Sequence, residues 1–279
     1  MMARISKEVQ KKHNQAMSLI NLDRDLKFSE KEFCFENLRE ELILADYSYH
    51  GAFFTPMDLA ESLGPHFIDA PLCMENKPRT VVDLCAGFGI LSYCLSEFHS
   101  NQLDLYCVEK NPVFVKIGKK LVPNATWICG SIDSPEVIDR LRQIKVDAVI
   151  SNPPYGDMEL DFGGRYRGSK AEYAIAEFAR SLTRGLVLFI LPQGSLNFKY
   201  SGVPSFQKVK NDRYQKFSLE TGVTIKPSNM VTDDSTKFRN TPITTEVCYI
   251  EGATQFDVPI ESESRIKPKV DMFADFMSA

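Results

Sequence analysis

The sequence lacks the features of a membrane or secreted protein. It holds no run of about 18 apolar residues, so we expect no segment that crosses a membrane. The first 15 residues are strongly charged and have no apolar core, so they do not resemble a secretory signal. The seven cysteines never form Cys-x-x-Cys, and Cys107, Cys129 and Cys248 stand in apolar stretches typical of buried free thiols. These absences favour a protein of the reducing cytoplasm.

Histidine is also scarce, and the four present, at positions 13, 50, 66 and 99, stand far apart. The sequence therefore shows neither a metal-binding cluster nor a serine–histidine catalytic pair, and we expect no bound metal. It also lacks the Gly-x-Gly-x-x-Gly turn of dinucleotide-binding proteins and the Gly-Lys-Ser/Thr of P-loops.

The chain has no net positive charge: its formal net charge is −4. This value by itself argues against a nucleic-acid partner. The charge is uneven, however, because residues 165–216 hold ten Lys and Arg against three acids. Such a segment is typical of a phosphate-binding face on an acidic body, although any one residue could equally lie on a solvated helix face. The substrate-binding candidates among these bases are Arg165, Arg167, Lys170, Lys208, Lys210 and Arg213.

Aromatic residues alternate with basic ones over 198–217, where Phe198, Tyr200, Phe206, Tyr214 and Phe217 occur. Aromatic rings between cations suit stacking on nucleic-acid bases. An amphipathic helix that buries its aromatic face would show the same pattern, so both interpretations stay open.

The most informative stretch that is present is 146–156, where mostly apolar residues lead into Asn152-Pro153-Pro154-Tyr155. The two prolines have fixed φ and no N–H, so the turn is stiff. At the carboxyl edge of a parallel sheet, the Asn152 side chain and the Pro153 carbonyl would aim two acceptors at one amino group and stabilise positive charge growing on its nitrogen. Tyr155 would offer a ring face to a planar substrate. An ordinary proline-rich turn is the alternative for this tetrapeptide alone.

A second stretch, 80–92, has the pattern of a strand, a tight turn and a helix. Gly87 and Gly89 permit close approach of the backbone to a ligand. Asp83 at the end of the strand adds an acceptor for a cationic amine, which disfavours a pyrophosphate ligand. Glu109, at the end of the next strand, is placed to accept hydrogen bonds from ribose hydroxyls.

The order of elements predicts a doubly wound, mainly parallel α/β sheet, because strands alternate with helical stretches. Strands are expected at the start of 80–92, at 103–108, at 125–129, before Asn152, at 186–191 and at 245–250. Amphipathic helices are expected at 5–22 and 30–46, the second starting from a capping box at Ser29, and another begins at Thr55-Pro56 with Thr55 as N-cap. Residues 156–169 read as a flexible loop, either a lid or a simple connector.

Together these motifs resemble S-adenosylmethionine-dependent amino-methyltransferases of the adenine-N6 DNA type. That class runs from Phe-x-Thr-Pro through Asp-x-x-x-Gly-x-Gly to Asn-Pro-Pro-Tyr. The chain has Phe54-Thr55-Pro56, Asp83-x-x-x-Gly87-x-Gly89, Glu109 and residues 152–155 in that order, across roughly 51–251.

The resemblance implies an α/β, Rossmann-like, doubly wound and mostly parallel seven-stranded methyltransferase sheet in residues 49–251. An N-terminal helical extension (1–48) would precede it and a C-terminal tail (252–279) would follow. It further implies S-adenosylmethionine as cofactor and DNA as partner. The reaction would be methyl transfer to the N6 amine of an adenine that flips into the Asn-Pro-Pro-Tyr pocket, as in restriction–modification systems.

The resemblance also assigns roles to residues. Thr55, Asp83 and the turn at Gly87 would hold the methionine end of the cofactor, and Glu109 would hold its ribose. Ser131 stands where the family usually has an acidic contact to the cofactor's adenine, and Phe238 would sandwich the flipped base. The expected cofactor-binding residues are Phe54, Thr55, Asp83, Ala86, Gly87, Gly89, Glu109, Ser131, Ile132, Asp133 and Asn152, and the expected catalytic residues are Asn152, Pro153, Pro154 and Tyr155.

The chain departs from the family in showing no target-recognition domain after residue 251. Recognition of the DNA target sequence would then depend on residues 156–169, residues 195–240 or the N-terminal helices. Otherwise a second copy in a homodimer or a specificity partner would supply it. RNA adenine-N6 methylation and protein glutamine methylation remain alternatives, since a side-chain amide also presents an NH₂. Cytosine-C5 methylation is excluded because no Pro-Cys dipeptide supplies its nucleophile.

Overall fold

The computed structural model describes residues 5–43, 54–69, 79–100, 102–228, 230–232, 238 and 243–252, with the backbone alone for 65–69. The predicted tail, apart from Gly252, lies outside the described residues, as do His50, Cys73 and the junction between the N-terminal extension and the catalytic part. Within the described part of the chain, no helix is long and apolar enough to cross a membrane.

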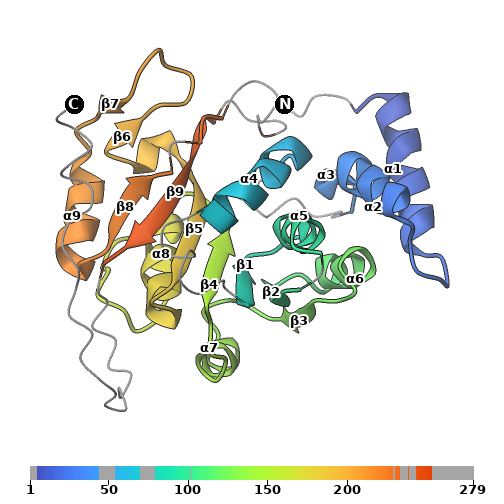
Figure 1. Cartoon of the computed structure of the whole chain (residues 1–279), viewed down its shortest axis with the longest axis horizontal. Coiled ribbons are helices and arrows are strands. Elements are labelled where there is room, and N and C mark those ends of the chain that lie inside the picture. Colours follow the sequence, from blue (N-terminus) through green and yellow to red (C-terminus); the bar gives the residue numbers. More distant parts are fainter. Residues whose placement is uncertain are drawn as a thin grey trace.

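A seven-stranded sheet in the order β3-β2-β1-β4-β5-β9-β8 forms the centre of the molecule (Figure 1). The pairs among β1 to β5 are parallel, and β9 runs antiparallel to both β5 and β8. The predicted Rossmann-like fold class is therefore confirmed. The strands are β1 (Thr80–Leu84), β2 (Asp104–Glu109), β3 (Thr126–Cys129), β4 (Ala148–Ser151), β5 (Leu186–Pro192), β8 (Thr224–Pro227) and β9 (Thr245–Glu251).

Helices cover both faces of this sheet, and the alternation of side chains along each strand divides the core in two. In β5, Leu186, Leu188 and Ile190 pack in one cluster with helices α4 (Met57–Asp69), α5 (Ile90–Phe98) and α6 (Pro112–Leu121). Val187 and Phe189 point the other way, toward α7 (Pro135–Arg142), α8 (Ala171–Leu182) and α9 (Asp212–Thr221). Such doubly buried strands read as continuous apolar runs, which is why they were visible in the sequence.

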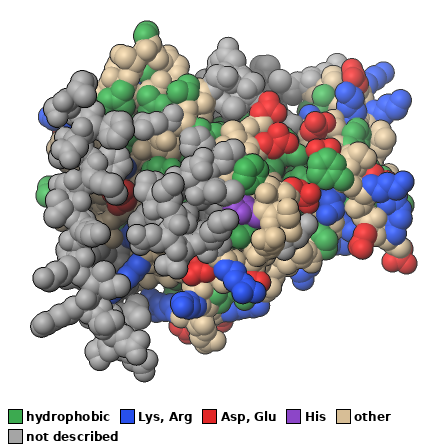
Figure 2. All heavy atoms as spheres, viewed as in Figure 1, with side chains coloured by type: hydrophobic (Ala, Val, Ile, Leu, Met, Phe, Trp, Pro, Cys, Tyr) green, Lys and Arg blue, Asp and Glu red, His purple; other side chains and the backbone are tan. Residues whose placement is uncertain are grey.

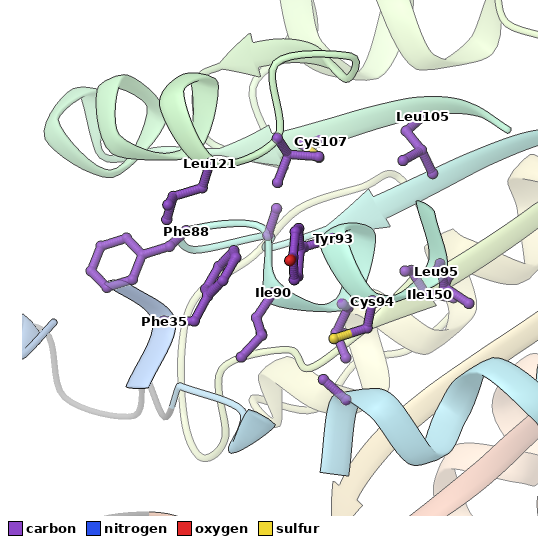
Figure 3. Close-up of a cluster of buried hydrophobic side chains, with 14 of the residues drawn as sticks. Phe35, Phe88, Ile90, Tyr93, Cys94, Leu95, Leu105, Cys107, Leu121 and Ile150 are labelled. Atoms are coloured by element: carbon purple, nitrogen blue, oxygen red, sulfur yellow. The ribbon is translucent and has the colours of Figure 1, made fainter. Parts of the chain in front are cut away.

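The N-terminal helices pack onto the first of these clusters. Phe35 of α2 (Phe28–Asn37) lies against Tyr93 of α5, with ring centroids 4.9 Å apart (Figure 3). Lys120 of α6 donates hydrogen bonds to the carbonyl oxygens of Leu22 and Arg24, in the loop that follows α1 (Lys7–Ile20). The N-terminal helices therefore share one hydrophobic core with α5 and α6 of the sheet domain.

Two predictions about the second helix were wrong in detail. The segment 30–46 is not one helix, because α2 ends at Asn37 and a short α3 (Glu40–Ile43) follows. The capping position is Lys27 rather than Ser29: the Glu30 carboxylate accepts a hydrogen bond from the Lys27 N–H, at 2.8 Å, and also binds Arg24. The predicted box paired Ser29 with Glu32, whereas the box that forms pairs Lys27 with Glu30, two residues earlier.

Other differences lie at the margins of the sheet. Cys107 and Cys248 are buried as predicted, whereas Cys129 is exposed, because it ends the short edge strand β3. The edge strand β8 was not predicted, since only Ile225 of its four residues is buried. A two-stranded hairpin, β6 (Phe198–Lys199) and β7 (Gln207–Lys208), follows a 3-10 turn, η2 (Gln193–Ser195), that starts where β5 ends.

Candidate cofactor and acceptor site

A cavity opens at the carboxyl edge of β1, β2 and β4, where doubly wound sheets place their ligands. The space at this edge, including the open mouth of the cavity, is about 990 Å³. Nine of the eleven predicted cofactor residues line it: Phe54, Thr55, Asp83, Ala86, Gly87, Glu109, Ser131, Ile132 and Asn152. Pro154 of the predicted catalytic set lines it too. Residues scattered over a hundred positions of sequence thus meet at one site.

Asp83 is the least satisfied polar group of this wall. Its side chain is buried near the end of β1, and Oδ2 accepts a hydrogen bond from Ser92 Oγ at 2.9 Å. Its Oδ1 atom has no hydrogen-bond partner among the described residues. Burial raises the pKa of the carboxyl from 3.8 to about 7, and the hydrogen bond from Ser92 offsets only part of this. A buried oxygen without a partner suits a cationic ligand group such as an ammonium.

Glu109 ends β2 and faces the same cavity. Its two oxygens accept hydrogen bonds from the Gly87 N–H at 3.0 Å and the Asn111 N–H at 2.8 Å. Burial raises its pKa, while these two backbone hydrogen bonds work in the opposite direction. The carboxylate therefore ties the glycine turn to the next strand and keeps lone pairs that can accept from ligand hydroxyls.

The turn between β1 and α5 brings backbone close to an aromatic wall. Gly87 has φ +57°, and a Cβ there would lie 2.8 Å from the Phe54 ring, so a side chain would be both strained and crowded. Phe54 packs in turn on Phe88 and Phe114, with ring centroids 4.6 and 5.2 Å away. Phe54 and Phe114 therefore give the cavity an apolar, closely packed part of its wall.

The Asn152 side chain is held at both ends of its amide. Its Nδ2 donates to Thr55 Oγ1 at 3.0 Å, and its Oδ1 accepts from the Tyr155 hydroxyl at 2.5 Å. The same hydroxyl lies 3.2 Å from the Ile190 carbonyl oxygen of β5. The helix that Thr55 was predicted to cap begins at Met57, two residues later, and the Thr55 hydroxyl accepts the hydrogen bond from Asn152. These contacts fix the direction in which Asn152 presents its oxygen.

Residues 156–169, expected to be a flexible loop, are pinned onto α8. The buried Glu172 accepts from the Gly156 N–H at 2.9 Å, directly after the Asn-Pro-Pro-Tyr turn, and from Ser195 Oγ at 2.5 Å. The buried Glu177 accepts from the Arg165 and Tyr166 N–H groups at 2.7 and 3.0 Å. Met158 and Leu160 of this loop line the cavity, so the loop forms part of its wall.

Other predicted residues lie away from the cavity surface. Gly89 is buried as the N-cap of α5, and Asp133 accepts a hydrogen bond from Ser131 Oγ one shell behind the lining. Pro153 and Tyr155 belong to the turn but are not among the described residues that line the cavity. Phe238 is buried in the core cluster of α4 and α5 and is not part of that lining either.

The basic candidates lie on the surface, and none of them lines the cavity. Arg165, Arg167, Lys208, Lys210 and Arg213 are exposed, and Lys170 is half-buried. Lys170 pairs with Asp157 and Lys210 with Asp212, at 3.3 and 3.4 Å. Two of the three acids in residues 165–216, Glu172 and Glu177, are buried, which leaves the exposed surface of this segment more basic than its sequence.

Several lining residues were missed from the sequence. Phe114 and Ile175 come from helices whose apolar residues follow an ordinary core pattern, so no signal marked them. Cys85 and Lys110 lie next to recognised motif residues, and adjacency was the available signal. Cys85 has φ +64°, which costs a non-glycine residue about 1–2 kcal/mol, and it lines the site in that conformation.

The structure combines a mostly parallel sheet, in which β9 alone of the seven strands runs antiparallel to both of its neighbours, with a cavity between a glycine turn and two acidic strand ends. This arrangement is typical of a site for a nucleotide-type ligand. Residues 70–200 match the methyltransferase small domain family. No curated protein matches the chain.

Among solved structures, the methyltransferase subunit of a type I restriction–modification system from Streptococcus thermophilus is similar at 19% identity, with a TM-score of 0.51. The match covers 75% of this chain and 46% of that subunit, so the chain spans about half its length. A protein from Listeria monocytogenes described as a class I S-adenosylmethionine-dependent methyltransferase has 13% identity and a TM-score of 0.47, covering 92% and 90% of the two chains. One from Pyrococcus horikoshii described as an RNA methyltransferase has 18% identity and a TM-score of 0.40, covering 92% and 100%.

The family match supports S-adenosylmethionine-dependent methyl transfer as the class of activity, with S-adenosylmethionine as the cofactor. The cavity fits that group: Asp83 offers an unpaired oxygen for its ammonium, Glu109 offers acceptors for its ribose, and Phe54 and Phe114 offer apolar surface.

Proposed function

We propose that this chain transfers the methyl group of S-adenosylmethionine to the exocyclic N6 amine of adenine in DNA. The observation that carries the proposal is the position of Asn152: its amide lines the cavity, is oriented by Thr55 and Tyr155, and stands in a proline-stiffened turn at the end of β4. An acceptor oxygen held in this way suits a planar NH₂ group.

Catalysis in this account relies on positioning. The cofactor, when bound, supplies a methyl group already activated by its sulfonium. Asn152 Oδ1 and the Pro153 carbonyl would accept hydrogen bonds from the two N–H groups of the amine and stabilise the charge that develops on nitrogen. The methylated nitrogen then loses one proton to water. Orientation and charge stabilisation together replace a strong base, and the site needs no histidine.

The target base must leave the stack to reach this cavity, which costs a few kcal/mol in a duplex. Contacts to the phosphates would offset that cost, and exposed basic side chains suit this use. We assign it to the basic substrate candidates, which are Arg165, Arg167, Lys170, Lys208, Lys210 and Arg213. A second copy of the chain or a specificity subunit would supply any reading of longer target sequences.

Labelled S-adenosylmethionine offered with DNA, RNA and protein in parallel tests the proposal. We expect label in DNA, and we expect Asn152→Ala to lower the transfer rate about 10²–10³-fold, because one preorganised group at the charge-developing atom is removed. Calorimetry should show that this variant still binds the cofactor. Label in RNA or on protein glutamine would replace the proposed acceptor, and undiminished transfer by Asn152→Ala would refute the role of the turn.

A further inference from the structure

The five aromatic residues between 198 and 217 separate into two groups in the structure. Phe198, Tyr200, Tyr214 and Phe217 are buried in the core. Phe206, which lies just before β7, is 48% exposed. The sequence pattern therefore combined a buried aromatic face with one ring that is open to solvent.

Phe206 is not a loose surface side chain, because it forms part of an aromatic stack. Its ring lies nearly parallel to that of Phe198, at 6.1 Å and 20°, and Phe198 lies nearly parallel to Tyr200, at 6.1 Å and 11°. The Tyr200 hydroxyl donates to the Val247 carbonyl oxygen at 2.7 Å. The stack thus leads from β9, the strand next to the edge of the sheet, to the surface.

The hairpin that carries this stack is anchored by one buried carboxylate. Glu246 of β9 accepts hydrogen bonds from the Tyr200 and Ser201 N–H groups at 2.9 and 3.0 Å, from Ser201 Oγ at 2.6 Å and from Gln193 Nε2 at 2.6 Å. Four donors on one fully buried group fix the base of the hairpin. The Phe206 ring, which stacks on β6 of this hairpin, is therefore preorganised, so little ordering cost is left for binding.

Charge and position complete the surface. Residues 193–211 contain Lys199, Lys208 and Lys210 and no acidic residue. The exposed residues near Phe206 include Pro204 and Val209, and Figure 2 shows hydrophobic side chains gathered over the hairpin. The hairpin follows directly from the carboxyl end of β5, so it rises from the same edge of the sheet as the candidate site (Figure 1).

We propose that the hairpin of residues 198–208 enters duplex DNA, with Phe206 stacked on a base and its lysines at the phosphates. Apolar wedges of this kind separate base steps, and a ring between bases compensates for the stacking that is lost when the target base flips out. Lys210 pairs with Asp212, whereas the hairpin itself carries Lys199 and Lys208 and no acidic residue. This local excess of positive charge favours a polyanion over an apolar protein partner. The inference rests on the proposed function and names the element that contacts its substrate.

Two kinds of variant separate the ring from the charges. Phe206→Ser should raise the Kd for duplex DNA about 5- to 150-fold, which is the range of base–aromatic stacking energies, and should leave the salt dependence unchanged. Phe206→Trp should restore the affinity. Lys208→Glu with Lys210→Glu should instead flatten the slope of log K against log salt, by roughly 0.9 for each phosphate that is no longer neutralised. Fluorescence anisotropy at several salt concentrations measures all of these.

Leu219→Ser is the matched control, because Leu219 is 87% exposed on α9 and lies outside the hairpin. It should bind DNA as the wild type does. Calorimetric cofactor affinity and the thermal midpoint of Phe206→Ser should match the wild type, which would show that the fold is intact.

The outcomes separate the two proposals. If the wild type methylates DNA and Phe206→Ser binds duplex DNA with unchanged Kd, insertion of Phe206 between bases is refuted and the proposed function stands. If the wild type neither binds nor methylates DNA, both fail. If Phe206→Ser changes only the self-association measured by sedimentation, the hairpin is an interface between two copies of the chain and its insertion into DNA is refuted.

Discussion

Replacing Asp83 by Asn tests whether this carboxylate is kept for a ligand rather than for stability. Its pKa is raised from 3.8 to about 7 by burial in the protein without cofactor. A raised carboxyl pKa means that the folded state holds the proton more tightly than the unfolded chain. The associated stability is present at low pH and is lost as pH rises toward 7.

The magnitude follows from the size of that change in pKa. The change in pKa corresponds to about 4 kcal/mol in the free energy of unfolding, of which about 2.5 kcal/mol is lost between pH 5 and pH 8. The amide that Asp83→Asn introduces does not titrate, so the variant should become more stable than the wild type by this amount as pH is raised. For a chain of this size the difference is about 5–10 °C in Tm.

Thermal unfolding of both proteins at pH 5, 6, 7 and 8 measures this directly. Saturating S-adenosylmethionine should reduce the difference in stability between wild type and Asp83→Asn, because a cofactor ammonium at Asp83 Oδ1 would pair with the ionised carboxylate. Asp139→Asn, at an exposed position on α7, controls for the general effect of removing a charge. A stability difference between wild type and Asp83→Asn that does not vary with pH would refute the reasoning.

Three further variants test separate parts of the site and fold. Glu109→Ala should weaken cofactor binding about 10- to 100-fold in calorimetry, through loss of a charged acceptor, and unchanged affinity would remove it from the site. Glu172→Ala should lower kcat and leave cofactor affinity unchanged, because the Gly156 N–H next to the Asn-Pro-Pro-Tyr turn loses its hydrogen-bond acceptor. Glu172→Gln should retain more activity than Glu172→Ala. An equal loss of kcat in the two variants would count against a role for Glu172 in positioning this turn. Gly118→Ala should lower the free energy of unfolding by about 1–3 kcal/mol, because its Cβ would lie 2.1 Å from the Trp127 ring. Urea unfolding measures this, and an unchanged midpoint would contradict this packing.

The sheet and the motif residues were predictable because local sequence determines them. Strands buried on both faces show as apolar runs, and the residues that end them, such as Asp83, Glu109 and Asn152, must meet at one edge when the strands are parallel. The strand β8 escaped prediction because Ile225 alone among its four residues is buried. Its pairing depends on β9, far away in the sequence.

Side-chain contacts across the fold were not predictable. That Tyr155 turns its hydroxyl to Asn152, or that Glu172 holds Gly156, follows from how the ends of β4, β5 and α8 come together. The same applies to residues 198–217, where composition could not show that Phe206 alone of five aromatics stays exposed.

The identity of the methylated product tests the central claim most directly. Duplex DNA incubated with the protein and labelled S-adenosylmethionine would be digested to nucleosides and separated by mass spectrometry. We predict that the label is found in N6-methyldeoxyadenosine, and that it falls about 10²–10³-fold with Asn152→Ala. Label in any other nucleoside, or the same yield from the variant, would contradict the account.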